Sequence, residues 1–319
     1  MKKSLSVLWL AVMLTSLVPF TASAYDFELD GIYYSIIDSS RVAVVSGNGG
    51  EGTYRGNVFI PDSVVHDGVN YTVTEIGDAF FKCTQLITVT IPPTITDLYW
   101  DAFLDAFFNR IIVRDLEAWC RINFVVDGCF GLMDPYPEVE VGTHGMESDQ
   151  DMVNLVVPQA ITYIHDFTFY KINTITSVVI PDQVTTVGEG AFFGCYNLKS
   201  LKIGPNVTSI KNYAFDTNSY LFDWEYNTNS NIINEVTCMA TVPPVIASKH
   251  CFNKATYKHG TLYVPAQSMR AYCQDEYWGL FENIMPIPES KPGDVNDDGM
   301  IDITDVTTLI DMLLNGDGQ

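Results

Sequence analysis

Basic residues and histidines are scarce in this sequence. Its 319 residues hold 17 Lys and Arg against 39 Asp and Glu, which gives a formal net charge of −22. Phosphate backbones and anionic membrane surfaces repel such a chain, and no basic patch offsets the repulsion. We therefore exclude nucleic acid as a partner, and the acidity favours solubility and cation binding.

Signatures of the common catalytic and zinc sites are also missing. No HExxH, GxSxG, phosphate-binding loop or dinucleotide-binding glycine pattern occurs, and no CxxC pair lies among the seven cysteines. Cys120 beside Trp119 resembles a nucleophile only superficially, and a packed apolar pair is the better interpretation. We predict that the chain is not an enzyme, with a hydrolase of unrecognised site as the remaining alternative. The five histidines stand at scattered positions: His66, His144, His165, His250 and His259.

Only one long apolar run occurs, and it lies at the beginning of the chain. Lys2 and Lys3 precede the run Leu5–Phe20, and the small residues Ala22–Ala24 precede Tyr25. This is the pattern of a cleaved signal peptide over residues 1–24, and the run is short for a membrane span of about 20 residues. An uncleaved anchor is the alternative. Losing the two lysines takes the net charge from −22 to −24. We expect a secreted or cell-surface protein whose mature chain has no transmembrane segment.

One apolar block recurs along the chain. Val184–Pro205 reads VTTVGEGAFFGCYNLKSLKIGP, and its apolar pattern returns at a fixed distance of 23 residues. Downstream, the equivalent residues are Val207, Ile210, Ala214 and Phe215. Upstream, they are Ile161, Ile164, Phe169, Ile172, Ile175, Val178 and Ile180, and further copies begin at Val73 and Ile95. Self-similarity at such a period predicts a solenoid.

Each copy contains a short strand that ends at proline. Alternation along Leu86–Pro92 places Val89 inward and both Thr88 and Thr90 outward. The Ala-Phe pair of each copy then lies on the opposite side of its coil. We expect one phenylalanine per coil to stack into a spine, namely Phe80, Phe103, Phe169, Phe192 and Phe215.

The cysteines give an ambiguous signal. Export normally implies disulfides, but the number of cysteines is odd. Cys83 and Cys195 occupy the same position of the repeat, which favours small buried hydrophobic residues. A Cys120–Cys129 pair is left open.

The repeat pattern divides the chain into five parts. The regular copies predict a β-rich solenoid of about 23-residue coils at residues 73–285. The predicted parts are a signal peptide at 1–24, an N-terminal β cap at 25–72, the solenoid at 73–285 with an insertion at 104–152, a linker at 286–293 and a tail at 294–319.

The tail carries the one chemically specified site. Oxygen-bearing residues fall at positions 1, 3, 5, 9 and 12 of the loop Asp294–Asp305, and Gly299 stands at position 6. This spacing predicts a calcium loop, since a hard cation needs several oxygens from one flexible segment. A solvated acidic turn is the alternative, and Val306–Leu314 predicts a small amphipathic helix after the loop. The expected calcium ligands are Asp294, Asn296, Asp298, the backbone carbonyl of Met300, Asp302 and Asp305.

Two resemblances follow from these motifs. Residues 73–284 resemble the BspA-type leucine-rich repeats of bacterial surface proteins, through VTEIGDAFFKCTQLITVTIP, VTTVGEGAFFGCYNLKSLKIGP and VTSIKNYAF. That resemblance implies a curved, right-handed solenoid with a parallel sheet on its concave face, surface display and a role in adhesion. Residues 294–314 resemble one half of a type I dockerin, a family that normally has two such segments and binds a cohesin.

We therefore expect a non-enzymatic binding or adhesion protein for an extracellular protein or glycan. Calcium-dependent assembly into a secreted, polysaccharide-degrading complex through a cohesin-like partner is the alternative. Protein partners need hot spots, so Lys202 and Tyr263 on the strands, and Tyr220, Trp224 and Tyr226 in the long loop, are the candidate ligand residues. Packing of the loop aromatics on their own coil is an equal alternative. The outward strand residues are Thr88, Thr90, Ser177, Val179, Ser200, Lys202, Thr237 and Tyr263.

Overall fold

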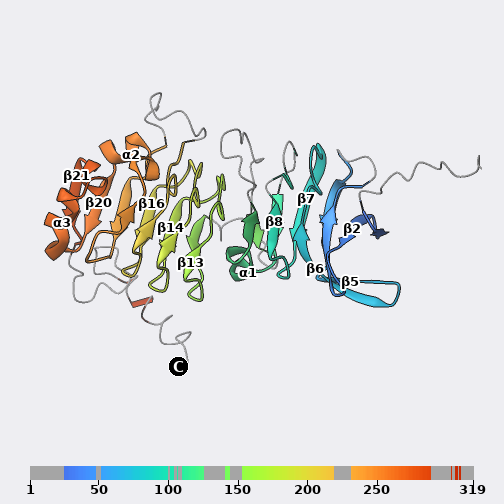
Figure 1. The fold of residues 1–319 in the computed structure, drawn as a ribbon. Coiled ribbons are helices and arrows are strands. Elements are labelled where there is room, and N and C mark those ends of the chain that lie inside the picture. Colours follow the sequence, from blue (N-terminus) through green and yellow to red (C-terminus); the bar gives the residue numbers. More distant parts are fainter. Residues whose placement is uncertain are drawn as a thin grey trace, which may run out of the picture.

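The computed structural model shows an elongated stack of coils running from the N-terminal to the C-terminal end (Figure 1). The residues that it describes are 25–47, 52–99, 101–103, 106, 110–125, 141–143, 153–218 and 231–288, with positions 303, 306, 307 and 309. The predicted signal peptide and all six predicted calcium ligands lie outside the described residues.

Two sheets carry one strand of each coil. What we call the N-terminal sheet has the order β11-β9-β7-β4, and the principal sheet has the order β12-β14-β16-β18-β20-β21. Every strand pair within these two sheets is parallel. The first comprises β4 (Arg55–Phe59), β7 (Gln85–Ile91), β9 (Arg110–Val113) and β11 (Val141–Thr143). The second comprises β12 (Asn154–Val156), β14 (Ser177–Ile180), β16 (Ser200–Ile203), β18 (Glu235–Cys238), β20 (Thr261–Val264) and β21 (Asn283–Pro286).

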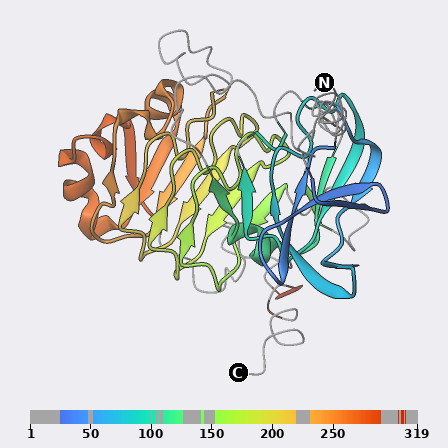
Figure 2. The same ribbon diagram turned by 45° about the vertical axis from the view of Figure 1, so that its right-hand side comes forward.

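Two further sheets carry the other strand of each coil, so the chain alternates between them and the first two (Figure 2). One has the order β1-β2-β3-β6-β8-β10 with β5 paired to β6, and the other has the order β13-β15-β17-β19. Their strands are β1 (Phe27–Leu29), β2 (Ile32–Ile36), β3 (Arg41–Val45), β5 (Ser63–His66), β6 (Val69–Ile76), β8 (Asp97–Tyr99), β10 (Asn123–Val125), β13 (Tyr163–Ile164), β15 (Thr186–Val187), β17 (Ser209–Ile210) and β19 (Val245–Ile246).

The predicted period sets the register of the sheets. Ser177 pairs with Ser200, and Thr186 pairs with Ser209, each one 23-residue copy apart. Ser200 then pairs with Glu235, which is 35 residues on. The 12 extra residues equal the length of 219–230, which lie outside the described residues. The break in the sequence period is therefore an insertion of 12 residues between strands that remain in register.

The predicted phenylalanine spine is present as two stacks, and no ring contact joins Phe103 to Phe169 in the described part of the chain. Phe80 stacks on Phe103 with ring centroids 5.0 Å apart. Phe192 stacks on Phe169 at 5.0 Å and on Phe215 at 5.4 Å. Phe252, which the period did not indicate, adds one more ring 5.4 Å from Phe215. All of these phenylalanines are buried, so the spine is the centre of the core.

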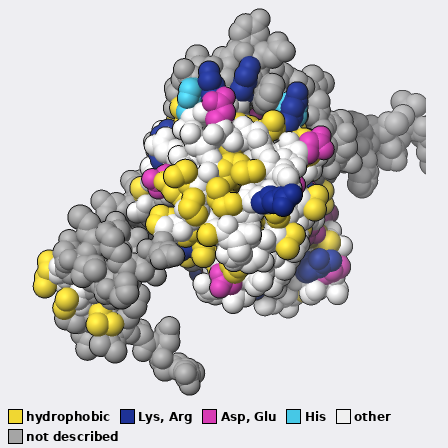
Figure 3. Space-filling view, turned by 90° about the vertical axis from the view of Figure 1, so that its left-hand side faces the viewer, with side chains coloured by type: hydrophobic (Ala, Val, Ile, Leu, Met, Phe, Trp, Pro, Cys, Tyr) yellow, Lys and Arg dark blue, Asp and Glu magenta, His cyan; other side chains and the backbone are white. Residues whose placement is uncertain are grey.

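Short helices close the C-terminal end of the stack. They are α2 (Lys254–His259), α3 (Met269–Gln274) and the 3-10 turns η1 (Lys249–Cys251), η2 (Ala266–Ser268) and η3 (Trp278–Leu280), while α1 (Leu116–Cys120) lies in the N-terminal half. Tyr272 donates to the Ala240 carbonyl at 2.8 Å, and the Trp278 indole donates to the Pro244 carbonyl at 2.8 Å. Hydrophobic side chains gather on this end of the molecule (Figure 3).

Two predicted boundaries are refined by the sheets. Within 104–152, β9 pairs with β7 and β11 pairs with β9, so the described parts of the predicted insertion continue the N-terminal sheet. At the far end, Pro286 belongs to β21, and the Ile287 N–H donates to the Val264 carbonyl at 2.8 Å. The ladder therefore runs past residue 286, where we had placed the start of the linker.

The described cysteines form no disulfide. Cys83, Cys120, Cys195, Cys238 and Cys251 are buried thiols, and Cys273 is exposed. Burial raises the pKa of Cys120 and of Cys195 to about 12, so these thiols stay protonated. They act as small core residues, as the repeat position of Cys83 and Cys195 predicted.

In the tail, the four described positions are helical. Val306 and Leu309 lie in the predicted helix and are 47% and 45% exposed, and Ile303 is 71% exposed. No helix in the described part of the chain is both long and apolar enough to cross a membrane.

Candidate functional site

Two parallel rows of side chains point outward from the principal sheet, because residues in register on parallel strands share one face. The first, which we call the polar row, consists of Asn154, Ser177, Ser200, Glu235, Thr261 and Asn283. The second, which we call the mixed row, consists of Val156, Val179, Lys202, Thr237, Tyr263 and Met285.

The residues between these rows fix the face rigidly. Val178, Leu201, Val236 and Leu262 alternate with the outward residues and are no more than 1% exposed. Each outward side chain on β14, β16, β18 and β20 is therefore mounted on a backbone that is hydrogen-bonded on both sides, whereas β12 and β21 are paired on one side only. A partner that binds here does not have to order the backbone, which lowers the entropic cost of association.

The mixed row has the composition of a protein-binding surface. Val156 and Met285 are 55% and 51% exposed, so both apolar side chains are accessible to a partner. Lys202 is exposed and makes no ion pair with any described residue, and Tyr263 is half-buried. The row thus offers apolar contact area, one aromatic ring and one cation, which are features of interface hot spots.

The structure brings together two of the residues selected from sequence. Lys202 and Tyr263 lie in the mixed row on β16 and β20, with Thr237 of β18 between them. At the usual spacing of neighbouring strands, their backbones are about 10 Å apart. Tyr220, Trp224 and Tyr226 lie outside the described residues, so their place remains a prediction.

One outward residue was predicted wrongly. Thr90 is 6% exposed and therefore buried. In the register of the N-terminal sheet it stands between Phe59 and Ile112, whose larger side chains flank it. Ser177, Val179, Ser200, Thr237 and Thr88 are at least partly exposed, as alternation predicted.

Val156, Met285 and Phe59 were missed by sequence reasoning. Phe59 is 56% exposed and lies on β4, in the segment that we had treated only as a cap. Val156 and Met285 lie on the first and last strands of the principal sheet, where the repeat is weakest. Alternation in the segments NLV and NIMP was the available signal.

A buried polar network holds both ends of the loop 219–230. Asn253 is 0% exposed, and its Nδ2 donates to Thr217 Oγ1 and to the Asn231 carbonyl, each at 2.6 Å. The Thr217 hydroxyl also donates to the Asn231 carbonyl. Asn253 Oδ1 accepts from the Thr256 N–H at 2.7 Å and so caps α2. The network, which we call the loop clamp, ties the two loop ends to a rigid helix.

Asp216 lies beside the loop clamp and is 3% exposed. Its carboxylate accepts from the Asn218 N–H at 3.0 Å. Burial raises the pKa of the carboxyl to about 7, and the Asn218 hydrogen bond only partly opposes that rise.

Replacing Asp216 by Asn is expected to change how stability depends on pH. Because the carboxyl binds its proton more tightly in the folded state, the wild type loses stability as pH rises from about 4 to about 7 and is then level. Asp216→Asn lacks this titration, so its stability relative to that of the wild type should rise by on the order of 4 kcal/mol between pH 4 and pH 8. Urea unfolding at a series of pH values measures the difference. Parallel pH profiles for the two proteins would contradict the assignment.

A polar cluster on the sheet of β13, β15, β17 and β19 is the nearest arrangement to an acid–base site in the described regions. Lys211 Nζ donates to Tyr163 Oη at 2.8 Å and to Asp166 Oδ1 at 3.0 Å. The Glu189 N–H also donates to Asp166 Oδ1, at 2.8 Å. Burial acts to lower the pKa of Lys211, but the hydrogen bonds to Tyr163 and Asp166 outweigh it and raise that pKa. The Asp166 carboxylate is occupied by these donors, so the cluster ties coils together.

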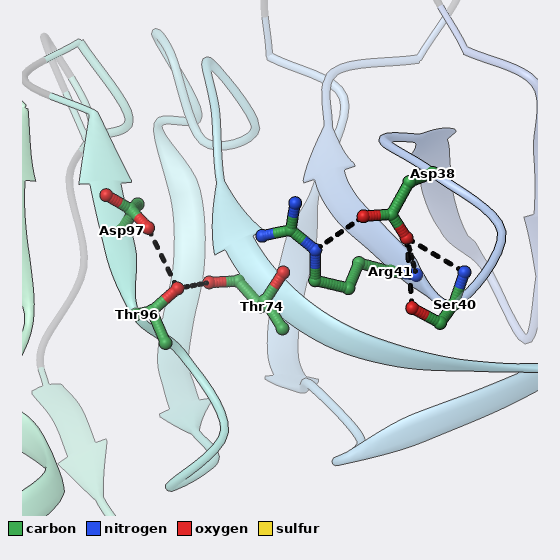
Figure 4. A network of polar contacts seen from close by, with 6 residues as sticks. All are labelled: Asp38, Ser40, Arg41, Thr74, Thr96 and Asp97. Carbon is green, nitrogen blue, oxygen red and sulfur yellow. Dashed lines mark hydrogen bonds and ion pairs between the residues drawn. The ribbon is translucent and has the colours of Figure 1, made fainter.

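Near the N-terminal end, a second group of polar contacts joins side chains to neighbouring loop and strand residues (Figure 4). Arg41 Nε donates to Asp38 Oδ2 at 2.8 Å, and Asp38 Oδ1 accepts from the Ser40 N–H and hydroxyl. The hydrogen bond from Arg41 and those from Ser40 lower the pKa of Asp38 to about 2. The Thr96 hydroxyl contacts the Thr74 carbonyl at 3.2 Å and Asp97 Oδ2 at 2.8 Å. Because these groups bond to each other, they stabilise the ends of the loops and strands and do not form a binding site.

Among the described residues, no group of three or more His, Cys, Asp or Glu could hold a metal ion. The predicted calcium loop Asp294–Asp305 lies outside them, so calcium remains a prediction from ligand spacing.

Comparisons with known proteins support the solenoid. The sequence model of a family described as BspA type Leucine rich repeat region matches residues 63–119 and 141–242 in six copies. No curated protein matches the chain.

Three solved structures illustrate the similarity. A leucine-rich repeat protein from Bacteroides ovatus is 17% identical, with a TM-score of 0.36, over 75% of this chain and 71% of that one. The pneumococcal vaccine antigen PcpA is 10% identical, with a TM-score of 0.27, over 83% and 99%. A leucine rich cell surface protein from Faecalibacterium prausnitzii is 12% identical, with a TM-score of 0.27, over 82% and 95%. TM-scores this low carry no conclusion about a ligand.

Proposed function

The chain carries BspA-type leucine-rich repeats, and on that premise we propose that it is a non-enzymatic, secreted or cell-surface binding protein. The observation that supports this most is the mixed row, a rigid outward face that combines exposed apolar side chains with Tyr263 and with Lys202, which makes no ion pair in the described part of the chain. The predicted signal peptide supports export.

The chemistry of the face favours a protein partner over a glycan. Lys202 is the one cation among the outward residues of β12 to β21, and Glu235 is the one anion. A partner with an acidic group opposite Lys202 and apolar side chains opposite Val156, Val179 or Met285 matches the row. The neighbouring polar row offers hydrogen-bonding groups, but Tyr263 is the one aromatic ring among the outward residues of these strands, so a glycan is the second outcome to test.

The double substitution Lys202→Ala and Tyr263→Ala is expected to weaken binding at least tenfold. Two hot-spot side chains at the centre of an interface contribute at least about 1 kcal/mol each. The measurement is binding of the mature protein to a panel of purified extracellular-matrix proteins and to a glycan array. Lys258→Ala, on the exposed surface of α2 away from the row, is the matched control and should bind as wild type. Unchanged binding by the double variant would reject the mixed row as the site.

The alternative function rests on the tail. We propose that Asp294–Asp305 binds calcium through side-chain oxygens at positions 1, 3, 5, 9 and 12 and the Met300 carbonyl. Binding would order the loop and the helix after it, and could support calcium-dependent assembly with a cohesin-like partner.

Titration calorimetry of the mature protein with calcium should show one site that is lost on Asp298→Ala, whereas Asp317→Ala, outside the loop, should leave it intact. No calcium-dependent heat in the wild type would remove this alternative. Calcium binding that fails to bring any cohesin to the protein would leave a structural role for the ion.

A further inference from the structure

The sheets of the N-terminal end are unequal in length. Beyond β6, the sheet that contains β8 and β10 continues through β3, β2 and β1. The N-terminal sheet, in contrast, stops at β4. No described residue pairs with the outer edge of β4. The core of the solenoid is therefore covered by strands on one side of this end and ends at an open strand on the other.

The backbone groups at that edge follow from the register of the sheet. The Ile60 N–H donates to the Thr90 carbonyl at 3.1 Å, so Ile60 and Val58 direct their backbone groups toward β7. By alternation, Asn57 and Phe59 direct their N–H and C=O groups away from the sheet. Both residues are exposed. An edge of this kind is a template for another strand.

A cavity of about 630 Å³ lies beside the edge. Its volume is in the range of pockets that hold ligands. The wall facing β4 comes from the turn and strands of the β1–β2 hairpin, including Leu29 and the buried Ile32 and Tyr34. Val64 of β5 also lines the cavity. The cavity thus occupies the place where the next strand of the N-terminal sheet would lie.

We propose that the outer edge of β4 accepts an extended peptide segment of a partner protein by β-strand addition. The backbone of the peptide pairs with the outward groups of Asn57 and Phe59, and its apolar side chains pack against the exposed side chains at the rim of the cavity. Phe59 is 56% exposed and Leu29 is 37% exposed, so both offer apolar contacts at the rim. This site is separate from the mixed row. A test that rejects binding at the principal sheet would therefore not reject peptide binding at β4.

Charge narrows the chemistry of the peptide. Arg55 begins β4, lines the cavity and makes no ion pair with a described residue. Asp30 lines the opposite wall of the cavity, so an acidic residue of the incoming segment fits beside Arg55 and away from Asp30. The expected ligand is therefore an extended, alternating apolar peptide with a carboxylate near one end.

The probe is a synthetic peptide with the sequence NTITSVVIPD, which copies residues 173–182 around β14. It has the alternating pattern of a strand from this solenoid and ends in an aspartate. With the full mature protein, we expect saturable binding and slower hydrogen exchange in the segment that holds Asn57 and Phe59. A scrambled peptide of the same composition should cause neither change.

Phe59→Pro tests the edge directly, because proline removes an outward N–H that the β4–β7 ladder does not use. Phe59→Leu keeps the amide and an apolar side chain and is the matched control. We expect Phe59→Pro to bind the peptide at least tenfold more weakly than Phe59→Leu, while near-ultraviolet circular dichroism shows both folded. Equal binding by the two variants overturns the proposal.

N-methylated peptides keep the test decisive if Phe59→Pro does not fold. Two versions of the probe are methylated on alternate backbone nitrogens, so only one version loses the amides that face β4. Strand addition predicts that one version binds the wild type and the other does not. Equal binding by both, or no exchange protection at Asn57 and Phe59 with millimolar peptide, overturns the proposal. A dimer of the protein that Phe59→Pro abolishes would instead assign the edge to a second copy.

Discussion

Replacing Phe192 by Ala is expected to lower the free energy of unfolding by about 3–5 kcal/mol. The ring is fully buried and lies between Phe169, at 5.0 Å, and Phe215, at 5.4 Å. The substitution therefore leaves a cavity in the middle of the spine and breaks two ring stacks. Because each coil contacts only its neighbours, the loss should weaken the coupling between the two sides of the gap.

Urea denaturation measures this effect. Phe59→Ala is the matched control, since that ring is 56% exposed and its loss, including the cation–π contact with Arg114, should change stability by less than about 1 kcal/mol. A lower cooperativity of unfolding in Phe192→Ala would show that the two halves had become uncoupled. A loss below about 1 kcal/mol would mean that the spine is not the centre of the core.

The second large effect is expected for Asn253→Ala, which should cost about 3 kcal/mol. The substitution removes two hydrogen bonds to Thr217 and Asn231 and one from the Thr256 N–H. Buried groups that lose a partner cost about 1–3 kcal/mol each, and loss of a helix cap adds about 1 kcal/mol. Partial rearrangement of the remaining bond between Thr217 and Asn231 limits the total.

Asn206→Ala is the matched control for the loop clamp. That exposed asparagine makes one hydrogen bond, to the Asp182 carbonyl at 2.8 Å, on a turn of another coil. Asn253→Ala should also speed limited proteolysis within residues 219–230, because the clamp no longer holds both ends of that loop. Equal stability and equal cleavage for the two variants would show that the clamp does not anchor the loop.

Most of the fold was predicted from the repeat period. A regular coil places one inward residue of each type above the last, so the spacing of Phe169, Phe192 and Phe215 directly predicts their stacking. Phe252 was not predicted as part of the spine because 37 residues separate it from Phe215, which is not the repeat period of 23 residues. Inserted residues conceal a repeat in the sequence while leaving it intact in space.

Contacts between residues distant in sequence were beyond prediction. The loop clamp joins Asn253 to Thr217 across 36 residues, and no local pattern marks either as buried. Thr90 shows the limit of strand alternation, because its burial comes from neighbouring strands and not from its own. The outward positions of Lys202 and Tyr263 were predictable because apolar and polar residues alternate within each of their strands, SLKI and TLYV.

Hydroxyl-radical footprinting of the protein with its partner tests the central claim most directly. Met285 and Tyr263 are reactive side chains in the mixed row, and Tyr163 reports on the sheet of β13, β15, β17 and β19. If the mixed row is the binding surface, the partner should reduce the labelling of Met285 and Tyr263 and leave Tyr163 unchanged. Unchanged labelling of Met285 and Tyr263 in a saturated complex would contradict the account.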